Sequence, residues 1–195
     1  MKLVIATHNA HKLEEFRGLL QLPGLDVAML PQGVPDAPET GTTFVENANM
    51  KARFYAEYVG DWVLSDDSGL EVPLLGGEPG IYSARYAGVH GDDAANNAKL
   101  IARLHECGQT QASASFVCAL AVYHKGNRLA SVEGRVAGTI FDHALGHAGF
   151  GYDPLFQPSG STLRFAEMTQ AQKAEHSHRA AALRQLAPRL QEWLD

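Results

Sequence analysis

The stretch Leu3-Val4-Ile5-Ala6-Thr7-His8-Asn9-Ala10-His11-Lys12 sets the fold class of this chain. Its first four residues form a short apolar run, which is typical of a buried β-strand that ends in a loop. A helical pattern follows the loop, with Leu13 and Phe16 on its apolar face, and Pro23-Gly24 ends it. A strand that leads through a polar turn into an amphipathic helix is the start of an α/β pattern.

Strands and helices continue to mix along the rest of the chain. Thr43-Phe44-Val45-Glu46 matches a capping box, which predicts that a helix begins there. Residues 114–123 and 129–140 predict an antiparallel hairpin. Further predicted elements are strands at 26–30 and 62–64, loops at 31–41 and 76–91, a helix at 92–107, and a helix from Thr169 that Pro188 kinks or divides. We therefore predict an α/β fold with a mixed sheet, in one domain over residues 1–195.

Composition excludes several classes of protein. The 195 residues are 45% hydrophobic and 19% charged, with a net charge of −6, which gives no support to nucleic-acid or membrane-surface binding. Cys107 and Cys118 form no CxxC pair, and two thiols in a chain of this length fit a reducing compartment. No apolar run approaches the length of a membrane helix or of a secretory signal. We therefore expect a cytoplasmic protein without membrane or nucleic-acid partners.

The turn from Thr7 to Lys12 is the first candidate site. A helix N-terminus presents unpaired N–H groups and a partial positive charge, and such a turn readily holds phosphate. Thr7 and Asn9 offer further hydrogen bonds, and Lys12 adds a cation. Taken alone, the turn fits an ordinary capped helix with a solvated lysine better.

A pair of carboxylates follows the strand at 62–64. Asp66-Asp67-Ser68-Gly69 come directly after it, and ligands of α/β proteins bind in loops at the carboxyl ends of strands. Adjacent carboxylates repel unless a cation or strong donors compensate, and Mg²⁺ accepts one or two carboxylates together with substrate phosphates. An Asx-turn or helix cap is the alternative, although it explains one aspartate better than two.

Glu39, Glu46 and Lys51 are weaker candidates. Glu39 and Glu46 flank a Gly-Thr-Thr turn and offer one more carboxylate, although the capping box accounts for Glu46. Lys51 is on the same predicted helix as Glu46, where a single lysine is usually solvated. Glu46 and Lys51 therefore support a functional site only in combination with the other clusters.

Two later clusters combine glycines, aromatic rings and cations. Gly149-Phe150-Gly151-Tyr152-Asp153-Pro154 lets a backbone approach a ligand and offers rings for base stacking, or else forms a tight turn whose rings fill the core. Lys173 with Ser177-His178-Arg179 suits an anion or a carbonyl oxygen, or is a polar helix end. His143 and His147 have the spacing of a zinc helix but lack its glutamate, so we do not expect structural zinc.

The order and spacing of these clusters resemble one family, the non-canonical purine nucleoside-triphosphate pyrophosphatases. The resemblance spans essentially the whole chain. Its motifs are Thr7-x-Asn9-x-x-Lys12, Glu46-Asn47-Ala48 with Lys51-Ala52, Asp66-Asp67-Ser68-Gly69-Leu70, Pro79-Gly80-Ile81-Tyr82-Ser83-Ala84-Arg85, Gly149-Phe150-Gly151-Tyr152-Asp153-Pro154 and Ser177-His178-Arg179.

This resemblance implies a Mg²⁺-dependent hydrolase that converts dITP, ITP or XTP to the monophosphate and pyrophosphate, which keeps deaminated purines out of DNA and RNA. It also implies an elongated mixed sheet with flanking helices, two lobes around a central cleft, and a homodimer. The alternatives are a pyrophosphatase of other modified or pyrimidine nucleotides, and a nucleotide sensor that does not hydrolyse. The paired carboxylates weigh against a sensor, since a pure binder does not need them.

The resemblance also implies a role for each motif residue. Asp67 is the expected general base and metal ligand, Glu39 the second metal ligand, and Asp66 and Lys51 the supports of the reacting phosphate and water. The expected substrate contacts are Thr7, His8, Asn9, Ala10, His11 and Lys12 at the triphosphate, Ser68, then Phe150, Gly151, Tyr152 and Asp153 at the base and sugar, Lys173, and His178 with Arg179 at the purine oxygen. His8 departs from the small Gly or Ser that is usual there, and a positive φ at this position would strain it.

Overall fold

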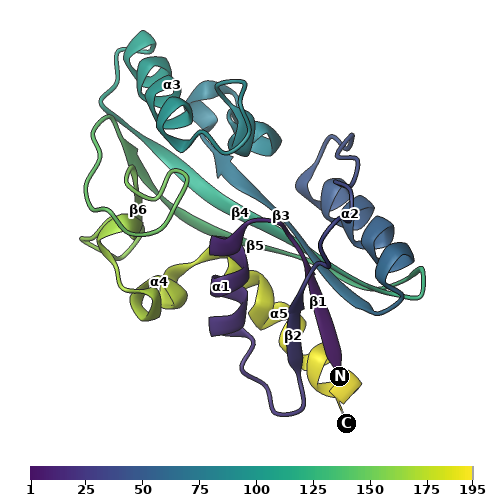
Figure 1. Cartoon of the computed structure of the whole chain (residues 1–195). Coiled ribbons are helices and arrows are strands. Elements are labelled where there is room, and N and C mark those ends of the chain that lie inside the picture. The colour runs from purple at the N-terminus through teal and green to yellow at the C-terminus, as the bar shows by residue number, and fades with distance from the viewer. Residues whose placement is uncertain (195) are drawn as a thin grey trace. The chain divides into compact units, whose positions relative to one another are not determined.

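The computed structural model describes residues 1–194 and contains a mixed six-stranded sheet flanked by helices (Figure 1). The predicted α/β class is confirmed. The elements in chain order are β1 (Lys2–Ala6), α1 (Ala10–Leu19), β2 (Asp26–Met29), α2 (Phe44–Val59), β3 (Trp62–Glu71), α3 (Asp93–Glu106), β4 (Gln111–His124), β5 (Asn127–Phe141), β6 (Phe156–Pro158), α4 (Gln170–His176) and α5 (His178–Leu194).

The order of strands across the sheet is β2-β1-β3-β4-β5-β6. Strand β1 pairs in parallel with β2 and with β3, whereas β5 and β6 are antiparallel, so the sheet is mixed as predicted. The turn between β4 and β5 is Lys125-Gly126, both with positive φ, as the tight turn of a hairpin requires.

The chain divides into two compact units. Unit 1 comprises Met1–Asp67, Cys118–Gly134 and the chain from Arg179, and unit 2 comprises Ser68–Val117 and Arg135–His178. Strands β3, β4 and β5 each contribute residues to both units. The expectation of a single domain over residues 1–195 stays a prediction.

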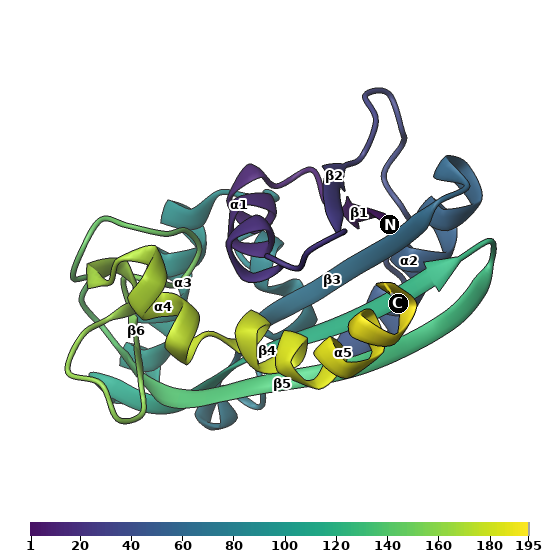
Figure 2. The ribbon, with the colours of Figure 1, turned by 90° about the horizontal axis from the view of Figure 1, so that it is seen from below.

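Unit 1 has an apolar layer on each face of its strands. On one face, Leu3 and Ile5 of β1 pack with Phe16 of α1 and with Leu186 and Leu190 of α5. Figure 2 shows α5 lying along β4 and β5. The alternate strand residues face α2, because successive side chains of a strand point to opposite sides. The Ser65 hydroxyl, for example, donates to the carbonyl of Ala48 on α2 at 2.5 Å.

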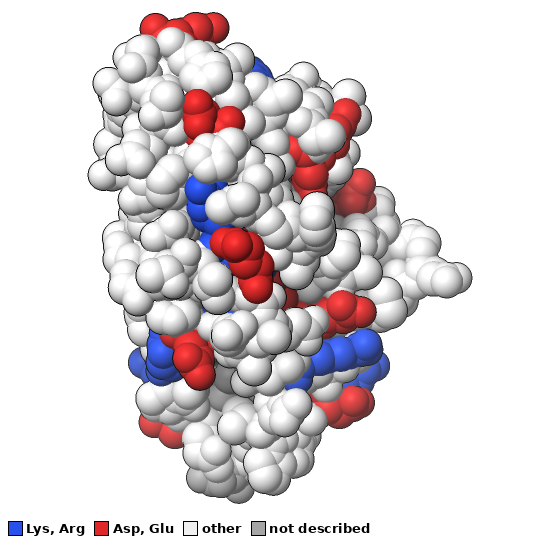
Figure 3. Space-filling model, turned by 90° about the vertical axis from the view of Figure 1, so that its left-hand side faces the viewer, with Lys and Arg blue, Asp and Glu red and all other residues white. Residues whose placement is uncertain are grey.

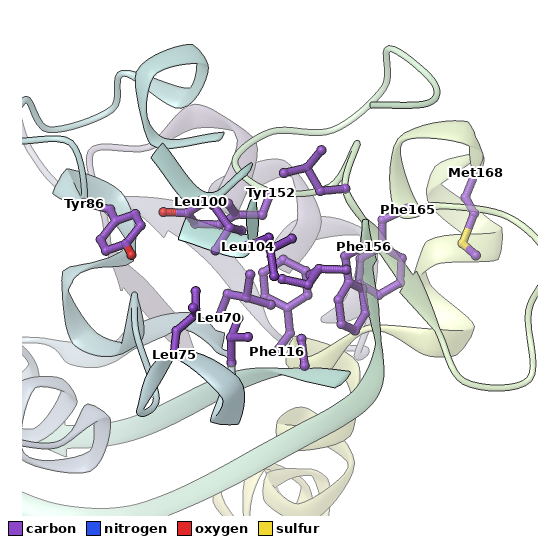
Figure 4. Packing of buried hydrophobic residues seen from close by; sticks show 14 residues of the cluster. Leu70, Leu75, Tyr86, Leu100, Leu104, Phe116, Tyr152, Phe156, Phe165 and Met168 are labelled. Carbon is purple, nitrogen blue, oxygen red and sulfur yellow. The ribbon is translucent and has the colours of Figure 1, made fainter. Parts of the chain in front are cut away.

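Unit 2 has a separate core built around aromatic rings (Figure 4). Phe116 of β4 packs against Phe156 and Phe165, with ring centroids 4.6 and 5.8 Å away. Leu100 and Leu104 of α3 are fully buried against the same cluster. This core fixes α3 and the segment 149–156, which carry one of the candidate clusters.

Strand β3 is longer than the sequence predicts, and this changes the setting of its two acids. The predicted strand ended at Leu64, with Asp66 and Asp67 in a loop, but β3 runs on to Glu71. The loop prediction was wrong because β4, its other neighbour in the sheet, continues beside β3. Pairing with β1 ends at Ser65, so the acids still lie just past the carboxyl end of β1.

The C-terminal helical region is divided at Ser177, and the division that the sequence offers at Pro188 is absent from residues 178–194. Ser177 has an extended backbone with ψ 148°, whereas α5 continues through Pro188. A proline inside a helix costs about 3 kcal/mol. Burial of a leucine side chain contributes about 1.5–3 kcal/mol, and buried leucines lie on both sides of Pro188, at Leu183, Leu186 and Leu190. Packing therefore outweighs the proline.

On the face shown in Figure 3, lysine and arginine side chains lie among aspartate and glutamate side chains. Exposed ion pairs of the described chain include Arg53 with Glu57 and Arg103 with Glu106. Pairs of this kind contribute little to stability. Among residues 1–194, no helix is both long enough and apolar enough to cross a membrane.

Leu120 provides a test of the unit 1 core, because it is fully buried on β4. We expect Leu120→Ala to lower the free energy of unfolding by about 2–5 kcal/mol, through lost burial and the cavity left behind. Urea denaturation followed by circular dichroism measures the change. Leu74→Ala is the control, since Leu74 is 47% exposed. Equal losses in the two variants would contradict the assigned core.

Candidate active site

The two adjacent carboxylates of β3 point to opposite faces of the sheet. Asp66 contacts Lys12 of α1 and Arg179 of α5, whereas Asp67 contacts Lys51 of α2. The alternation of side chains along a strand produces this separation. Each carboxylate therefore contacts its own cations, as the repulsion between adjacent acids requires.

Asp66 is buried in a network that joins four elements of unit 1. The Lys12 ammonium donates to its Oδ1, while Arg179 Nε donates to Oδ2 at 3.1 Å. The Cys118 thiol of β4 also donates to Oδ2, at 3.2 Å. Arg179 in turn donates from Nη1 to Glu15 of α1 at 2.8 Å. The network fixes the first turns of α1 and α5 against β3.

The charges in this network hold Asp66 in its ionised form. Burial alone would raise the pKa of Asp66, but the positive charges of Lys12 and Arg179 outweigh burial and hold it far below its ordinary value. The pKa of Arg179 is raised: burial opposes its charge, but the carboxylates of Asp66 and Glu15 outweigh burial. Burial raises the pKa of Cys118, which therefore stays a neutral thiol.

Asp67 belongs to a smaller cluster on the α2 side. The Lys51 ammonium lies 3.2 Å from Asp67 Oδ1 and 3.0 Å from Glu39 Oε1. Lys51 and Asp67 are almost buried, and the Glu39 side chain is 29% exposed. The structure thus brings together the predicted base, the predicted second metal ligand and the helix lysine.

The pKa values in this cluster suit acid–base chemistry. Burial raises the pKa of Asp67 above its ordinary value, and the charge of Lys51 offsets only part of that rise. Burial opposes the charge of Lys51, but Asp67 and Glu39 outweigh it and raise the pKa of the ammonium. Asp67 is therefore a stronger base than a solvated aspartate, beside a lysine that stays charged.

The oxygen atoms of Asp67 and Glu39 fit a divalent cation. Asp67 Oδ2 is buried and accepts no hydrogen bond from residues 1–194, so it has the capacity to bind an ion. In the described part of the chain, no three His, Cys, Asp or Glu side chains form a closed metal site. Mg²⁺ suits two carboxylates, because it usually completes its shell with water and substrate phosphate.

The turn from Thr7 to Lys12 is organised by its own side chains. Thr7 Oγ1 accepts a hydrogen bond from the Asn9 N–H, and Asn9 Oδ1 caps α1 by accepting from the Lys12 N–H. His8 does not have a positive φ, so its side chain imposes no backbone strain there. His8, Asn9, Ala10 and His11 are exposed.

In unit 2 the structure brings Phe150, Asp153 and Lys173 together. Asp153 Oδ2 accepts from the Phe150 N–H at 3.1 Å and from Lys173 Nζ at 2.7 Å. The Lys173 ammonium also lies 5.1 Å from the centroid of the Phe150 ring. A Cβ at Gly149 would lie 2.0 Å from Asp153 Oδ2, so this turn requires glycine.

Two predicted substrate contacts of unit 2, Tyr152 and His178, are buried. Tyr152 is 4% exposed, and its hydroxyl donates to the Ser83 carbonyl at 2.8 Å, so its ring fills the core and is not a face for base stacking. His178 is 3% exposed and stacks on Phe116 at 4.7 Å. Ser68 is half-buried on β3, directly after Asp67.

Sequence reasoning missed residues that support the predicted ones. Glu15 holds Arg179, and Asp93 of α3 accepts from the Gly151 N–H at 2.7 Å. Glu15 lies three residues after Lys12, so both point from one side of α1. That spacing is a usable signal for Glu15. The contact of Asp93 joins segments 58 residues apart and has no local signal.

The paired acids lie just past the carboxyl end of β1, beside a strand-to-helix turn, which is where α/β proteins bind their ligands. Comparison with known proteins gives the particular family. The chain belongs to the Ham1 family, whose sequence model matches residues 3–189.

Individual relatives match over nearly their whole length. A dITP/XTP pyrophosphatase of Exiguobacterium sp. is 49% identical over 189 residues, which are 95% of each chain. A dITP/XTP pyrophosphatase of Bacillus subtilis is 45% identical over 96% of each chain. The solved structure of a HAM1 protein from Coxiella burnetii has a TM-score of 0.88 at 38% identity, covering 98% of this chain and 99% of that one.

Asp66 gives a test of the buried network. We expect Asp66→Asn to lower the free energy of unfolding by about 3 kcal/mol near pH 7, because it leaves buried cations without their carboxylate. The folded pKa of Asp66 lies below its unfolded value of about 3.9. Its stabilisation is therefore present above pH ~4 and is lost as the pH falls toward the folded pKa.

Urea denaturation of Asp66→Asn and of the parent protein, from pH 7 to pH 3, measures the difference between their free energies of unfolding. Asp26→Asn is the control, because Asp26 is exposed at the start of β2 and its change stays within about 0.5 kcal/mol. A difference between Asp66→Asn and the parent protein that grows as the pH falls would contradict the network.

Proposed function

We propose that this protein hydrolyses dITP and XTP to the nucleoside monophosphate and pyrophosphate. The observation that carries the proposal is the cluster of Asp67, Lys51 and Glu39, an acid of raised pKa beside an ammonium and a second carboxylate. The proposal is supported by membership of the Ham1 family and by the names of relatives that are 49% and 45% identical.

Asp67 is the proposed general base. It accepts a proton from the water whose oxygen attacks the α-phosphorus, and the bond to the bridging oxygen of pyrophosphate breaks. Lys51, 3.2 Å from Asp67, orients this carboxylate and neutralises charge on the phosphate. The raised pKa of Asp67 makes proton transfer more favourable than it would be to a solvated aspartate.

Asp67 and Glu39 would hold the metal ion, which we propose to be Mg²⁺. The oxygen that supports this assignment is Asp67 Oδ2, buried and without a hydrogen-bond partner in residues 1–194. Bound there, Mg²⁺ would supply positive charge to the triphosphate and to the departing pyrophosphate.

The triphosphate is assigned to the turn Thr7–Lys12 and to Ser68. The turn is exposed and ends at a helix N-terminus, which favours anions. Asp66 fixes the last residue of this turn, because its carboxylate accepts a hydrogen bond from the Lys12 ammonium. We therefore propose that Asp66 positions the turn and does not contact the reacting water.

Base recognition is assigned to Phe150, Gly151, Asp153, Lys173, His178 and Arg179. Donors from His178 and Arg179 suit a 6-oxo purine, and a buried donor left unpaired opposite a 6-amino group costs about 1–3 kcal/mol. The bonds of Arg179 to Asp66 and Glu15 would fix the plane of its guanidinium for that contact. Guanine also has a 6-oxo group, so a further contact at position 2 is required to exclude it.

A homodimer and a cytoplasmic location belong to the same proposal. The homodimer is supported by the resemblance described above, and the cytoplasmic location by the two cysteines, which fit a reducing compartment.

The test of this function is pyrophosphate release from dITP, XTP, dGTP, dATP and dTTP, with and without Mg²⁺. We expect Mg²⁺-dependent release from dITP and XTP only. Asp67→Asn should lower kcat for dITP about 10³-fold while much of the dITP binding remains, because it removes the base. Preference for dTTP would favour the pyrimidine alternative, and nucleotide binding without any release would favour the sensor.

The dependence of kcat/KM on pH tests the pairing of Asp67 with Lys51. The acidic limb reports the ionisation of the base in the free enzyme, and the charge of Lys51 lowers the pKa of that base. Lys51→Met should therefore move the limb to higher pH as well as reduce the rate. Lys51→Arg keeps the charge and should leave the limb near its original pH. A limb that stays fixed or moves to lower pH in Lys51→Met would refute the pairing.

A further inference from the structure

Three side chains of α2 hold the segment that carries Glu39. Asn47 Oδ1 accepts from the Gly41 N–H at 2.8 Å, Lys51 Nζ lies 3.0 Å from Glu39 Oε1, and the Tyr55 hydroxyl accepts from the Ala37 N–H at 3.1 Å. We call Asn47, Lys51 and Tyr55 the anchor residues. They are four residues apart, so they lie in one row along the helix.

The segment 37–41 runs along this row in the direction opposite to the helix. Every second residue of the segment, namely Ala37, Glu39 and Gly41, contacts one anchor residue. It has no regular secondary structure of its own. Two of its backbone N–H groups therefore find their partners in the anchor residues. The position of the Glu39 carboxylate depends on these neighbours on either side of it.

The fit at one end of the row is close. A Cβ on Gly41 would lie 2.7 Å from Asn47 Oδ1 and 2.7 Å from Glu46 Cβ. Any larger residue at position 41 must push the segment away from α2. Asn47 itself is 1% exposed, so it has little room to adjust.

The other end of the row leads to the turn after β1. The Tyr55 ring is buried, and the His8 ring meets it edge-on with centroids 6.3 Å apart. His8 Nε2 lies 3.5 Å from Asp36 Oδ1, next to the anchored Ala37. Tyr55 thus contacts both the segment 37–41 and the proposed triphosphate turn.

We propose that Tyr55 and Asn47 are positioning residues that set the affinity for the metal ion by holding Glu39 beside Asp67. This inference rests on the proposed function, in which Glu39 and Asp67 bind a divalent cation. Neither residue touches the reacting atoms, so their loss should affect metal affinity more than the rate at saturating metal.

The test measures Mn²⁺ binding to the protein alone, by the electron paramagnetic resonance signal of free Mn²⁺. We expect Tyr55→Phe to weaken binding about five-fold, the factor expected from one hydrogen bond of ordinary strength. Tyr58→Phe is the matched control on the same helix, because the Tyr58 side chain is exposed, and it should bind as the parent does. Glu39→Gln calibrates the loss of the ligand itself.

Gly41→Ala tests the second contact, between Asn47 and the segment, without changing a residue of the helix. It should also weaken Mn²⁺ binding and raise the Mg²⁺ concentration needed for half-maximal dITP hydrolysis, with kcat at saturating Mg²⁺ within about two-fold of the parent. Thermal unfolding confirms that each variant is folded.

The outcomes separate the two proposals. Normal Mn²⁺ affinity in both Tyr55→Phe and Gly41→Ala, with weak binding in Glu39→Gln, overturns the positioning role and leaves the metal site intact. Equal affinity in Glu39→Gln and the parent overturns the metal site and with it the positioning role. A fall in kcat of Tyr55→Phe and Gly41→Ala at unchanged Mn²⁺ affinity also overturns the positioning role.

Discussion

The ionised carboxylate of Asp66, buried on β3, is the constraint on which unit 1 depends. A buried charge is tolerated only where opposite charges and hydrogen bonds replace its hydration. Lys12 and Arg179 provide these, and they come from positions far before and far after Asp66 in the chain. The requirement to neutralise one carboxylate therefore fixes how α1 and α5 meet the sheet.

Asp67 is the neighbour of Asp66, but its environment is different. Within residues 1–194 it pairs with Lys51, which it shares with Glu39, and its Oδ2 has no hydrogen-bond partner. Its pKa is raised where that of Asp66 is lowered. Two adjacent residues of the same type thus have opposite pKa shifts, because the strand turns them to different surroundings, and this difference underlies the chemical task that we propose for Asp67 alone.

Features that depend on local sequence were predicted well, whereas features that depend on long-range contacts were not. The Thr43 cap of α2 is confirmed, and Asp92 caps the helix predicted at 92–107, because each cap depends on residues within one helical turn. The length of β3 was missed, since polar Ser65, Asp66 and Asp67 indicate a loop until their buried partners are known. Whether Pro188 breaks a helix likewise depends on leucines packed elsewhere.

The candidate site shows the same limit. The family resemblance picked out Lys51, Asp67 and Glu39, and the structure brings them within ion-pair distance. The anchoring by Asn47 and Tyr55 was not predicted: Tyr55 fits the apolar face of α2, and nothing local shows that its hydroxyl meets Ala37.

The alternation along β3 also limits how this chain can change during evolution. Insertion of one residue between Trp62 and Ser65 would turn every later side chain of β3 to the other face. Asp66 would then meet Lys51, and Ser65 would replace it between Lys12 and Arg179. The stretch before the two acids must therefore keep its length, even where its individual side chains are free to vary.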